Sequence, residues 1–289
     1  MYFNQKYKLA IWAVSLSVVI ILYTLLYLQG IYVPSAPYFI PVTQRINNAF
    51  ALGIFIALFF PAIIEYNNTR WFQGVDFNTP RLLKDITETV KSGAPLYRAL
   101  EEATDRDYGP ISKTLENAMV KLHLSSDLKG ALDWLGETLI RPSIKRMSII
   151  LLEANEAGGD IIDLLNNSVH IFTNLAEYRE ERYQNSRPYI FLVYLGSIIF
   201  LIMSWLILTQ LLAPILAATS NPSVGQVGFI ATFLDIGYYK SILFWAAIIE
   251  AVFGGLVAGK ICEGRTSAGL IHSIILLAIT IIFFNSFNI

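Results

Sequence analysis

The residues closest to a nucleotide-binding pattern lie in one glycine-rich segment near the C-terminus. Residues 254–260 have the sequence Gly-Gly-Leu-Val-Ala-Gly-Lys, which satisfies most of a phosphate-binding loop. That loop places Ser or Thr after the lysine to hold magnesium, but here Ile261 follows, and no strand precedes the segment. Gly255 and Gly259 instead form a G-x-x-x-G pair, which predicts close packing between two membrane helices.

Other residue types used in catalysis are scattered along the chain. His123, His170 and His272 do not form the H-E-x-x-H arrangement of a zinc site, and Cys262 is the only cysteine. No G-x-S-x-G nucleophile motif occurs. We therefore predict no catalytic residue, no cofactor and no metal site.

A second glycine pair lies in the polar middle of the chain. Gly158, Gly159 and Asp160 partly match the G-x-G-D motif of intramembrane aspartyl proteases, but Ala157 occupies the first glycine position. The aspartate also lies in a polar segment rather than in an apolar run. We interpret Gly158 and Gly159 as a turn between two helices.

One carboxylate stands out because Glu250 lies near the middle of an apolar run. An ionised carboxylate at such a depth is costly and usually faces a partner or a cavity. A hydroxyl or amide of a neighbouring span, such as Thr209 or Gln210, is one expected partner. Contact with a translocated subunit, proton handling and a purely structural hydrogen bond all remain open.

The composition separates one polar segment from an otherwise apolar chain. The 289 residues are 55% hydrophobic and only 15% charged, whereas soluble proteins average about 25%. Residues 65–187 contain 15 of the 21 Lys and Arg and 19 of the 22 Asp and Glu. This distribution predicts a membrane protein with one water-soluble insert. A net charge of −1 gives no indication of nucleic-acid binding.

Five apolar runs are long enough to be membrane helices, because about 20 residues cross the hydrocarbon core. They are Leu9 to Leu28, Ala49 to Ile64, Tyr189 to Ala217, Ile242 to Ala258 and Ala268 to Phe287. Asn47 and Asn48 are expected at a membrane interface. We divide the chain into a two-helix anchor (1–69), a helical insert (70–188) and a three-helix membrane region (189–289).

The distribution of Lys and Arg near these runs predicts the orientation. One set of flanks carries Lys6, Lys8, Arg70, Arg81, Lys84, Arg179, Arg182, Arg187, Lys260 and Arg265. The opposite loops carry only Arg45 and Lys240. The N-terminus and the insert are therefore predicted to be cytoplasmic and the C-terminus external, in the cell membrane.

Within the insert, apolar residues recur with the helical period and predict six short antiparallel helices. Thr79 with Pro80 and, later, Ser126 are predicted helix starts, and Gly93 is a predicted stop. The predicted inward-facing positions are Leu82, Leu83, Ile86, Val90, Leu96, Ala99, Leu100, Ala103, Ile111, Leu115, Met119, Leu122, Leu128, Ala131, Leu132, Leu135, Leu139, Ile144, Met147, Ile150, Leu151, Ala154, Ile161, Leu164, Leu165, Val169 and Phe172. The fold class is thus all-α.

The ordered series of short motifs in the insert resembles the F domain of type II secretion systems. The series begins with residues 80–86 (PRLLKDI), continues with residues 90–96 (VKSGAPL) and 99–101 (ALE), and includes residues 130–132 (GAL) and 152–160 (LEANEAGGD). The resemblance covers about residues 76–186. That family comprises the membrane platform proteins of type IV pili, tight-adherence pili and archaeal flagella.

The resemblance implies a six-helix bundle without enzymatic activity. It also implies docking on a hexameric secretion ATPase in the cytoplasm and contact with pilin-like subunits in the membrane. Many relatives carry two F domains, so a chain with one is expected to form a homodimer or to pair with a second platform protein. The acidic residues Glu101, Glu102, Asp105 and Asp107 are candidate partner contacts, as is Glu250.

Two other classes of protein fit parts of the sequence. A transporter or channel would use Glu250 in its pathway, but it should also show several polar residues along the spans or an internal repeat. An intramembrane peptidase would need paired aspartates near the membrane, and these are absent. We therefore favour a platform protein that is embedded in membrane lipid.

Overall fold

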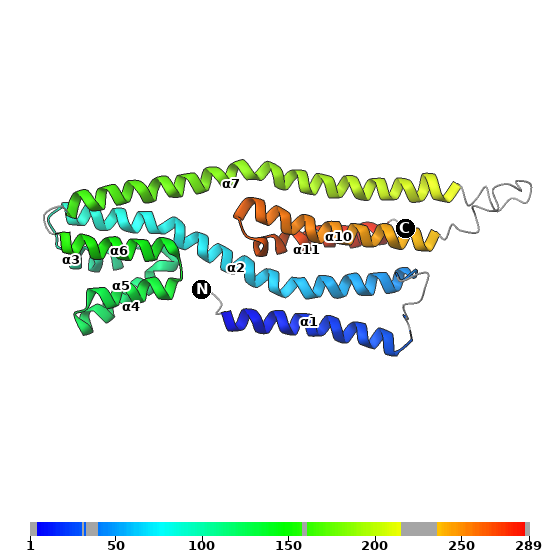
Figure 1. Cartoon of the computed structure of the whole chain (residues 1–289), viewed down its shortest axis with the longest axis horizontal. Helices are drawn as coiled ribbons and strands as arrows, with labels where there is room; N and C mark the ends of the chain where they lie inside the picture. Colours follow the sequence, from blue (N-terminus) through cyan, green and yellow to red (C-terminus); the bar gives the residue numbers. More distant parts are fainter. Residues whose placement is uncertain (1–4, 31, 33–39, 158–160, 215–235, 287–289) are drawn as a thin grey trace, which may run out of the picture. The chain divides into compact units, whose positions relative to one another are not determined.

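The computed structural model of the chain describes residues 5–30, 32, 40–157, 161–214 and 236–286 (Figure 1). These residues are mainly helical, and no strand occurs among them. They form two compact units, which we call the charged unit (residues 67–184) and the apolar unit (residues 5–66 and 185–286). The predicted all-α fold class is confirmed for the described residues.

The helices follow one another with short links. The elements are α1 (Gln5–Leu28), α2 (Gln44–Lys91), α3 (Leu96–Thr104), η1 (Gly109–Ile111), α4 (Ser112–Ser125), α5 (Leu128–Leu139), α6 (Pro142–Ala157), α7 (Ile161–Leu206), the π-helix η3 (Ile207–Leu212), α10 (Ile236–Glu263), η4 (Thr266–Gly269) and α11 (Leu270–Ser286). The helices α2 and α7 each contribute residues to both units.

Five helical segments are long and apolar enough to cross a membrane. They are Lys6–Leu28, Gln44–Lys91, Ile161–Leu212, Gly237–Glu263 and Thr266–Ser286. This count agrees with the five predicted spans, so the chain is a multi-pass membrane protein. Which side of the membrane each terminus occupies stays a prediction.

The second span does not end where the sequence predicted. We expected a separate helix to start at Thr79 and Pro80, but α2 runs without a break through both residues. The hydroxyl of Thr79 donates to the carbonyl of Val75 over 2.7 Å, within the same helix, instead of capping a new one. The helix continues because Phe72, Val75, Thr79 and Leu82 keep one face buried across the proline.

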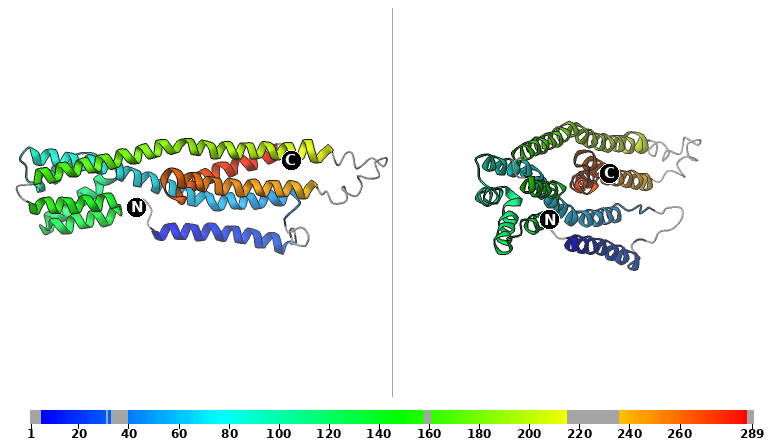
Figure 2. Two further views of the ribbon diagram at one scale, coloured as in Figure 1. Left: turned by 45° about the horizontal axis from the view of Figure 1, so that its top comes forward. Right: turned by 60° about the vertical axis from the view of Figure 1, so that its left-hand side comes forward.

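The charged unit is built around an apolar core from all its helices. The short helices α3, α4, α5 and α6 each pack on the next one along the chain (Figure 2). The predicted inward face of α3 is buried in full, and so are most of the other inward positions named above. The exceptions are partly buried at the edge of the core: Leu128, Ile150, Ile161, Leu164 and Val169. Tyr108 also lies in this core, with no exposed surface, and the sequence pattern did not single it out. The cytosolic location of this bundle stays a prediction.

The start of α5 differs from the sequence prediction by one residue. Ser126 was expected to cap this helix, but it adopts a left-handed conformation (φ 54°) at the end of α4. The cap is Asp127, whose carboxylate accepts a hydrogen bond from the Gly130 backbone N–H over 3.0 Å. Gly93 ends α2 with φ 93°, as predicted. The predicted turn at Gly158 and Gly159 lies outside the described residues.

In the apolar unit, α1 lies along α2 and supplies a hydrogen bond that α2 lacks. Pro61 lies inside α2 and has no N–H, so the carbonyl of Ala57, four residues earlier, loses its usual donor. The hydroxyl of Ser15 in α1 donates to that carbonyl and is itself buried. An unpaired carbonyl is costly in lipid, so this contact compensates for the proline.

Two polar contacts mark the ends of the membrane helices. Asn47 is fully buried between helices: it donates to the Ser241 hydroxyl over 2.8 Å and accepts from the Trp245 indole N–H over 3.0 Å. Its location at a membrane interface stays a prediction. At the other end of this region, Lys8 of α1 forms an ion pair with the buried Glu65 of α2. Because each side chain has its partners, these helices pack without unpaired charge at those positions.

Candidate partner-binding sites

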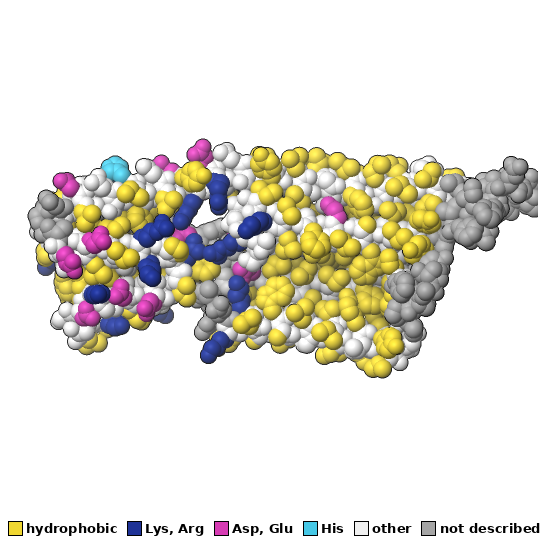
Figure 3. Space-filling view, in the orientation of Figure 1, with side chains coloured by type: hydrophobic (Ala, Val, Ile, Leu, Met, Phe, Trp, Pro, Cys, Tyr) yellow, Lys and Arg dark blue, Asp and Glu magenta, His cyan; other side chains and the backbone are white. Residues whose placement is uncertain are grey.

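The surface of the charged unit differs from that of the membrane helices. Lys, Arg, Asp and Glu side chains gather over α3 to α6 and the first part of α7, whereas hydrophobic side chains cover α1, α10 and α11 (Figure 3). Contacts with water-soluble partners are therefore expected on the charged unit, and contacts with lipid or other membrane helices on the apolar unit.

The four predicted acidic contact residues lie at the end of α3 and in the loop after it. Glu101 lies 3.4 Å from the ring of His123, and Glu102 lies 3.7 Å from the guanidinium of Arg106. Asp107 accepts hydrogen bonds from the backbone of Gly109 and the hydroxyl of Ser112. Asp105 is exposed at the C-terminal end of α3. This group is therefore not a bare negative patch, because Glu101 and Glu102 have basic neighbours and Asp107 stabilises a turn.

Exposed hydrophobic side chains lie beside Glu101. The rings of Tyr97 in α3 and His123 in α4 meet edge to face at 5.5 Å. On α4, Val120 is 57% exposed and Leu124 is 85% exposed, one helical turn apart. We call these four residues, together with Glu101, the α3–α4 face. Large exposed apolar side chains on a polar unit indicate a contact surface, and sequence periodicity missed them because they fall off the buried stripe.

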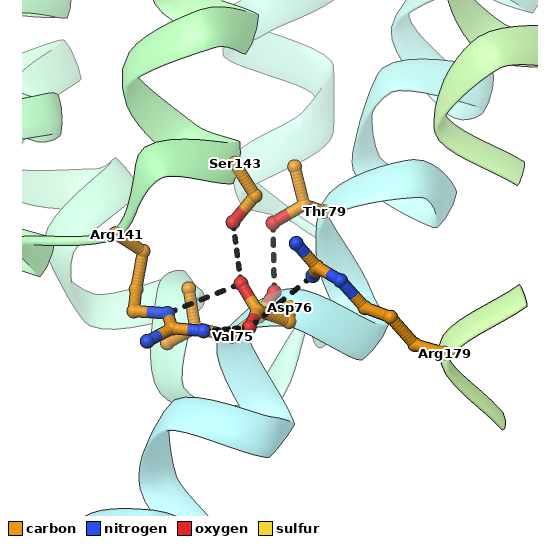
Figure 4. A network of polar contacts seen from close by, with 6 residues as sticks. All are labelled: Val75, Asp76, Thr79, Arg141, Ser143 and Arg179. Atoms are coloured by element: carbon orange, nitrogen blue, oxygen red, sulfur yellow. Dashed lines mark hydrogen bonds and ion pairs between the residues drawn. The ribbon is translucent and has the colours of Figure 1, made fainter. Parts of the chain in front are cut away.

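A partly buried charge network ties three helices of the charged unit together (Figure 4). Asp76 of α2 accepts hydrogen bonds from Nε of Arg141 at 3.1 Å and from the hydroxyl of Ser143 at 2.6 Å. Its second oxygen pairs with the Arg141 guanidinium and lies 3.3 Å from Arg179 of α7. Arg141 also lies over the ring of Phe72 at 4.9 Å. The network holds α2, the start of α6, and α7 in register.

The sequence did not single out Asp76. Arg141 lies 65 residues away from it, so no local spacing connects the two. Both side chains are about 15% exposed (15% and 14%), which makes the pair far less solvated than a surface ion pair. The loop that carries Arg141 follows Ile140, which adopts a left-handed conformation (φ 51°) at the end of α5.

A second polar site lies under the loop between α3 and α4. The hydroxyl of Tyr108 donates to Oδ2 of Asp85 over 2.7 Å, and Arg106 lies 3.1 Å from the same oxygen. The guanidinium of Arg81 lies 5.7 Å from the Tyr108 ring centre. Burial, followed by the hydrogen bond and the charge of Asp85, raises the pKa of Tyr108 well above its ordinary value. The site holds the loop onto α2.

In the apolar unit, Glu250 of α10 pairs with α7. Its Oε1 accepts a hydrogen bond from the hydroxyl of Ser197 over 2.6 Å. The partner therefore comes from the predicted span, but it is neither Thr209 nor Gln210. The Thr209 hydroxyl donates to the carbonyl of Trp205 over 2.8 Å, at the start of the π-helix, and Gln210 is exposed. Only the side chains on the face of α7 that packs against α10 can reach Glu250. The sequence does not reveal which face that is.

A second polar pair joins α7 to α11. Tyr194 of α7 lies one turn before Ser197, and its hydroxyl lies 3.0 Å from Nδ1 of His272 in α11. These two contacts connect α7 to both α10 and α11. Hydrogen bonds of this type stabilise helix association in lipid, each by about 0.6 kcal/mol on average.

The glycine-rich segment 254–260 is helical throughout and contacts the neighbouring helix with its backbone. A Cβ on Gly255 would collide with the backbone of Ser273, and one on Gly259 would collide with the backbone of Gly269. The segment is therefore a helix-packing surface, not a loop that could surround a phosphate. In the part of the chain that the structure describes, no group of three His, Cys, Asp or Glu residues could hold a metal ion.

Comparison with known proteins matches part of the chain to a family. Residues 82–209 match the family described as type II secretion system (T2SS), protein F. The chain carries a protein F domain. The resemblance predicted from the sequence is confirmed, although the match starts later than residue 76 and extends past residue 186 into the membrane part of α7.

Each of the two polar networks described above has residues on both sides of a boundary of the protein F match. Arg141, Ser143, Arg179 and Ser197 lie inside it, whereas Asp76 and Glu250 lie outside. Members of the protein F family are membrane platform proteins, not enzymes. Both polar networks thus join a residue of the domain to a residue beyond its boundaries.

One relative comes from an archaeon. The chain is 25% identical over 218 residues to an uncharacterized protein of Methanocaldococcus jannaschii, and the aligned region covers 75% of this chain. It covers only 33% of the relative, so the chain spans about a third of that protein's length. No solved structure matches the chain.

Proposed function

We propose that this protein is the membrane platform of a machine that assembles type IV pilus-like or archaeal filaments. In this role it couples a cytosolic hexameric ATPase to the insertion of pilin-like subunits and has no catalytic activity of its own. The observation that carries the proposal is the α3–α4 face, on which Val120 and Leu124 are exposed beside Glu101 in a protein F domain.

The composition of the face favours a partner with exposed apolar side chains surrounded by polar residues. Tyr97, Val120 and Leu124 supply the apolar contacts, and Glu101 and Glu102 supply carboxylates at its edge. Apolar residues at the centre with charges at the rim are the usual arrangement of a protein interface. The ATPase is the partner that the protein F family favours.

The helical connections between the units support a coupling role. The boundary at residues 66 and 67 lies within α2, and the boundary at residues 184 and 185 lies within α7. A helical connection transmits displacement better than a flexible linker of the same length. Movement imposed on the charged unit by the ATPase would therefore reach the membrane helices.

The proposed topology places the charged unit and the N-terminus in the cytoplasm and the C-terminus outside. It is supported by Lys6, Lys8, Lys260 and Arg265 on one set of flanks and by the scarcity of basic residues on the other. We also propose that the protein pairs, either with a second copy or with another platform protein.

Binding of the ATPase to the full-length protein in detergent tests the proposal. Leu124→Asp should weaken binding at least about tenfold, because it buries a charge at the centre of the interface. Ile171→Asp on α7 is a matched control, since Ile171 is 65% exposed in the same unit but lies off this face. Failure of the ATPase to bind, or an equal effect of both variants, would contradict the proposed docking. Ion flux through the protein in liposomes would favour a transporter instead.

A further inference from the structure

The carboxylate of Glu250 has capacity for more partners than its helix neighbours provide. Among the residues that the structure describes, Ser197 is its one hydrogen-bond donor, through Oε1. A carboxylate can accept about four hydrogen bonds. Glu250 is only half-buried, so part of the group faces outward from the contact between α7 and α10. Acyl chains of lipid offer no donor, which leaves the second oxygen without compensation in a bare membrane.

A glycine lies close in sequence to each of the two bonded residues, Ser197 and Glu250. Gly196 precedes Ser197 on α7, is exposed, and has no atom within 4 Å of the position that a Cβ would occupy. Gly254 lies one turn after Glu250 on α10, where a Cβ would lie 3.3 Å from Val193 of α7 and 3.8 Å from Oε1 of Glu250, so this glycine serves the packing of α7 on α10. Glycines permit the backbone of another helix to approach closely in lipid. The open position at Gly196 therefore leaves room for a third helix to approach α7 beside Ser197, the residue that bonds the carboxylate.

Exposed apolar residues border the same part of α10. Ile249, Phe253 and Val257 are 55%, 62% and 50% exposed and recur every four residues along one stripe of the helix. An apolar stripe with one acidic residue at its edge fits a membrane helix that is apolar except for one complementary group. A cation fits best, because pairing removes both charges from the hydrocarbon at once.

We propose that Glu250, at the contact between α7 and α10, binds a transmembrane helix of another chain that carries one protonated amine or guanidinium at the same depth. This inference rests on the proposed function, because the subunits that a platform moves are themselves membrane helices. The inference adds that such a subunit carries a cationic side chain at one position of its membrane helix. Ser197 holds the carboxylate in place before the partner arrives.

Synthetic transmembrane peptides with the full-length protein in liposomes test the proposal. Three peptides share one Leu- and Ala-rich helix and differ only in a central Lys, Gln or Leu. Energy transfer between labelled protein and labelled peptide measures binding. The Lys peptide should bind the native protein about tenfold or more tightly than the other two. A fourth peptide with Lys moved two turns along the helix should lose this preference.

Three variants separate the carboxylate from the fold. Glu250→Gln keeps the size of the side chain and should abolish the preference for Lys. Ser197→Ala keeps the carboxylate and should retain most of it. Glu263→Gln, at the C-terminal end of α10, should change nothing, and elution of each variant as a native-like species checks folding. Equal binding of the three peptides, or a preference that survives in Glu250→Gln, would overturn the proposal.

The outcome is independent of the ATPase experiment. If the peptides bind equally but Leu124→Asp still weakens ATPase binding, the inference about Glu250 fails and the platform function stands. If the Lys preference holds but no ATPase binds, the membrane site stands and the platform function fails.

Discussion

The hydroxyl of Tyr108 donates a hydrogen bond to the carboxylate of Asp85 across 2.7 Å, inside the core of the charged unit. Burial and Asp85 both raise the pKa of Tyr108, so the folded protein keeps its proton more tightly than the unfolded chain. The resulting stabilisation is complete below about pH 10, the pKa of an unfolded tyrosine, and falls as the pH rises above it.

Thermal unfolding of the full-length protein in detergent between pH 8 and 11 measures this effect. Tyr108→Phe should lower the free energy of unfolding at pH 8 by about 1.5–3 kcal/mol, because it removes a hydrogen bond to a charged group. The variant should also show a smaller decline in the free energy of unfolding above pH 10. Tyr97→Phe, on the partly exposed α3–α4 face, is the control. An unchanged alkaline decline in Tyr108→Phe would contradict the assignment.

Removal of the Asp76 carboxylate should strongly destabilise the charged unit. Asp76→Ala leaves the partly buried Arg141 without its counter-charge, and this should cost up to about 3–5 kcal/mol, the loss typical of a broken buried pair. Glu88→Ala is the matched control, since Glu88 is 58% exposed and pairs with Lys84 at 3.8 Å, a contact worth about 0–1 kcal/mol. Denaturant unfolding compares the two. Similar small losses in both variants would show that the Asp76 network contributes little.

The two glycines that differ most in their surroundings should respond oppositely to alanine. Gly259→Ala places a Cβ against the backbone of Gly269 and should cost about 1–3 kcal/mol through displacement of α11. Gly196→Ala meets open space within α7 and should leave stability unchanged or raise it by about 0.5–1 kcal/mol. Thermal unfolding midpoints in detergent provide the measurement. A neutral Gly259→Ala would mean that α10 and α11 do not pack this closely.

A double-mutant cycle tests the hydrogen bond that compensates for Pro61. Ser15→Ala should cost about 1 kcal/mol, because it leaves the Ala57 carbonyl without a donor. In a Pro61→Ala background, residue 61 has an N–H that can donate to the Ala57 carbonyl, so Ser15→Ala should cost less. Ser17→Ala is the control, since its hydroxyl is exposed and bonds Val14 of its own helix. Equal costs in both backgrounds would exclude compensation.

Labelling of introduced cysteines tests the proposed sidedness. In a Cys262→Ala background, a membrane-impermeant maleimide added to intact cells should label Arg45→Cys, which is exposed at the start of α2. Ser125→Cys, exposed at the end of α4, should react only after the cells are opened. The reverse pattern would invert the topology and remove the charged unit from the compartment of the ATPase.

The sequence by itself determined the properties that depend on neighbouring residues. The 3.6-residue period located the buried faces, such as Leu96, Ala99, Leu100 and Ala103 of α3, because one helix turn fixes which side chains share a face. The length of the apolar runs and the scarcity of charged residues within them identified the five spans. The order of short motifs was sufficient to indicate the protein F family.

Only the tertiary structure decided which residues meet across helices. Asp76 finds Arg141 across 65 positions, and Glu250 finds Ser197 across 53, because the crossing of two helices and not any sequence spacing brings them together. The continuation of α2 through Pro80 was also decided there, since burial of one face outweighed the local preference for a helix start. Local energies of a few tenths of a kcal/mol per residue indicate elements, whereas packing selects their partners and their ends.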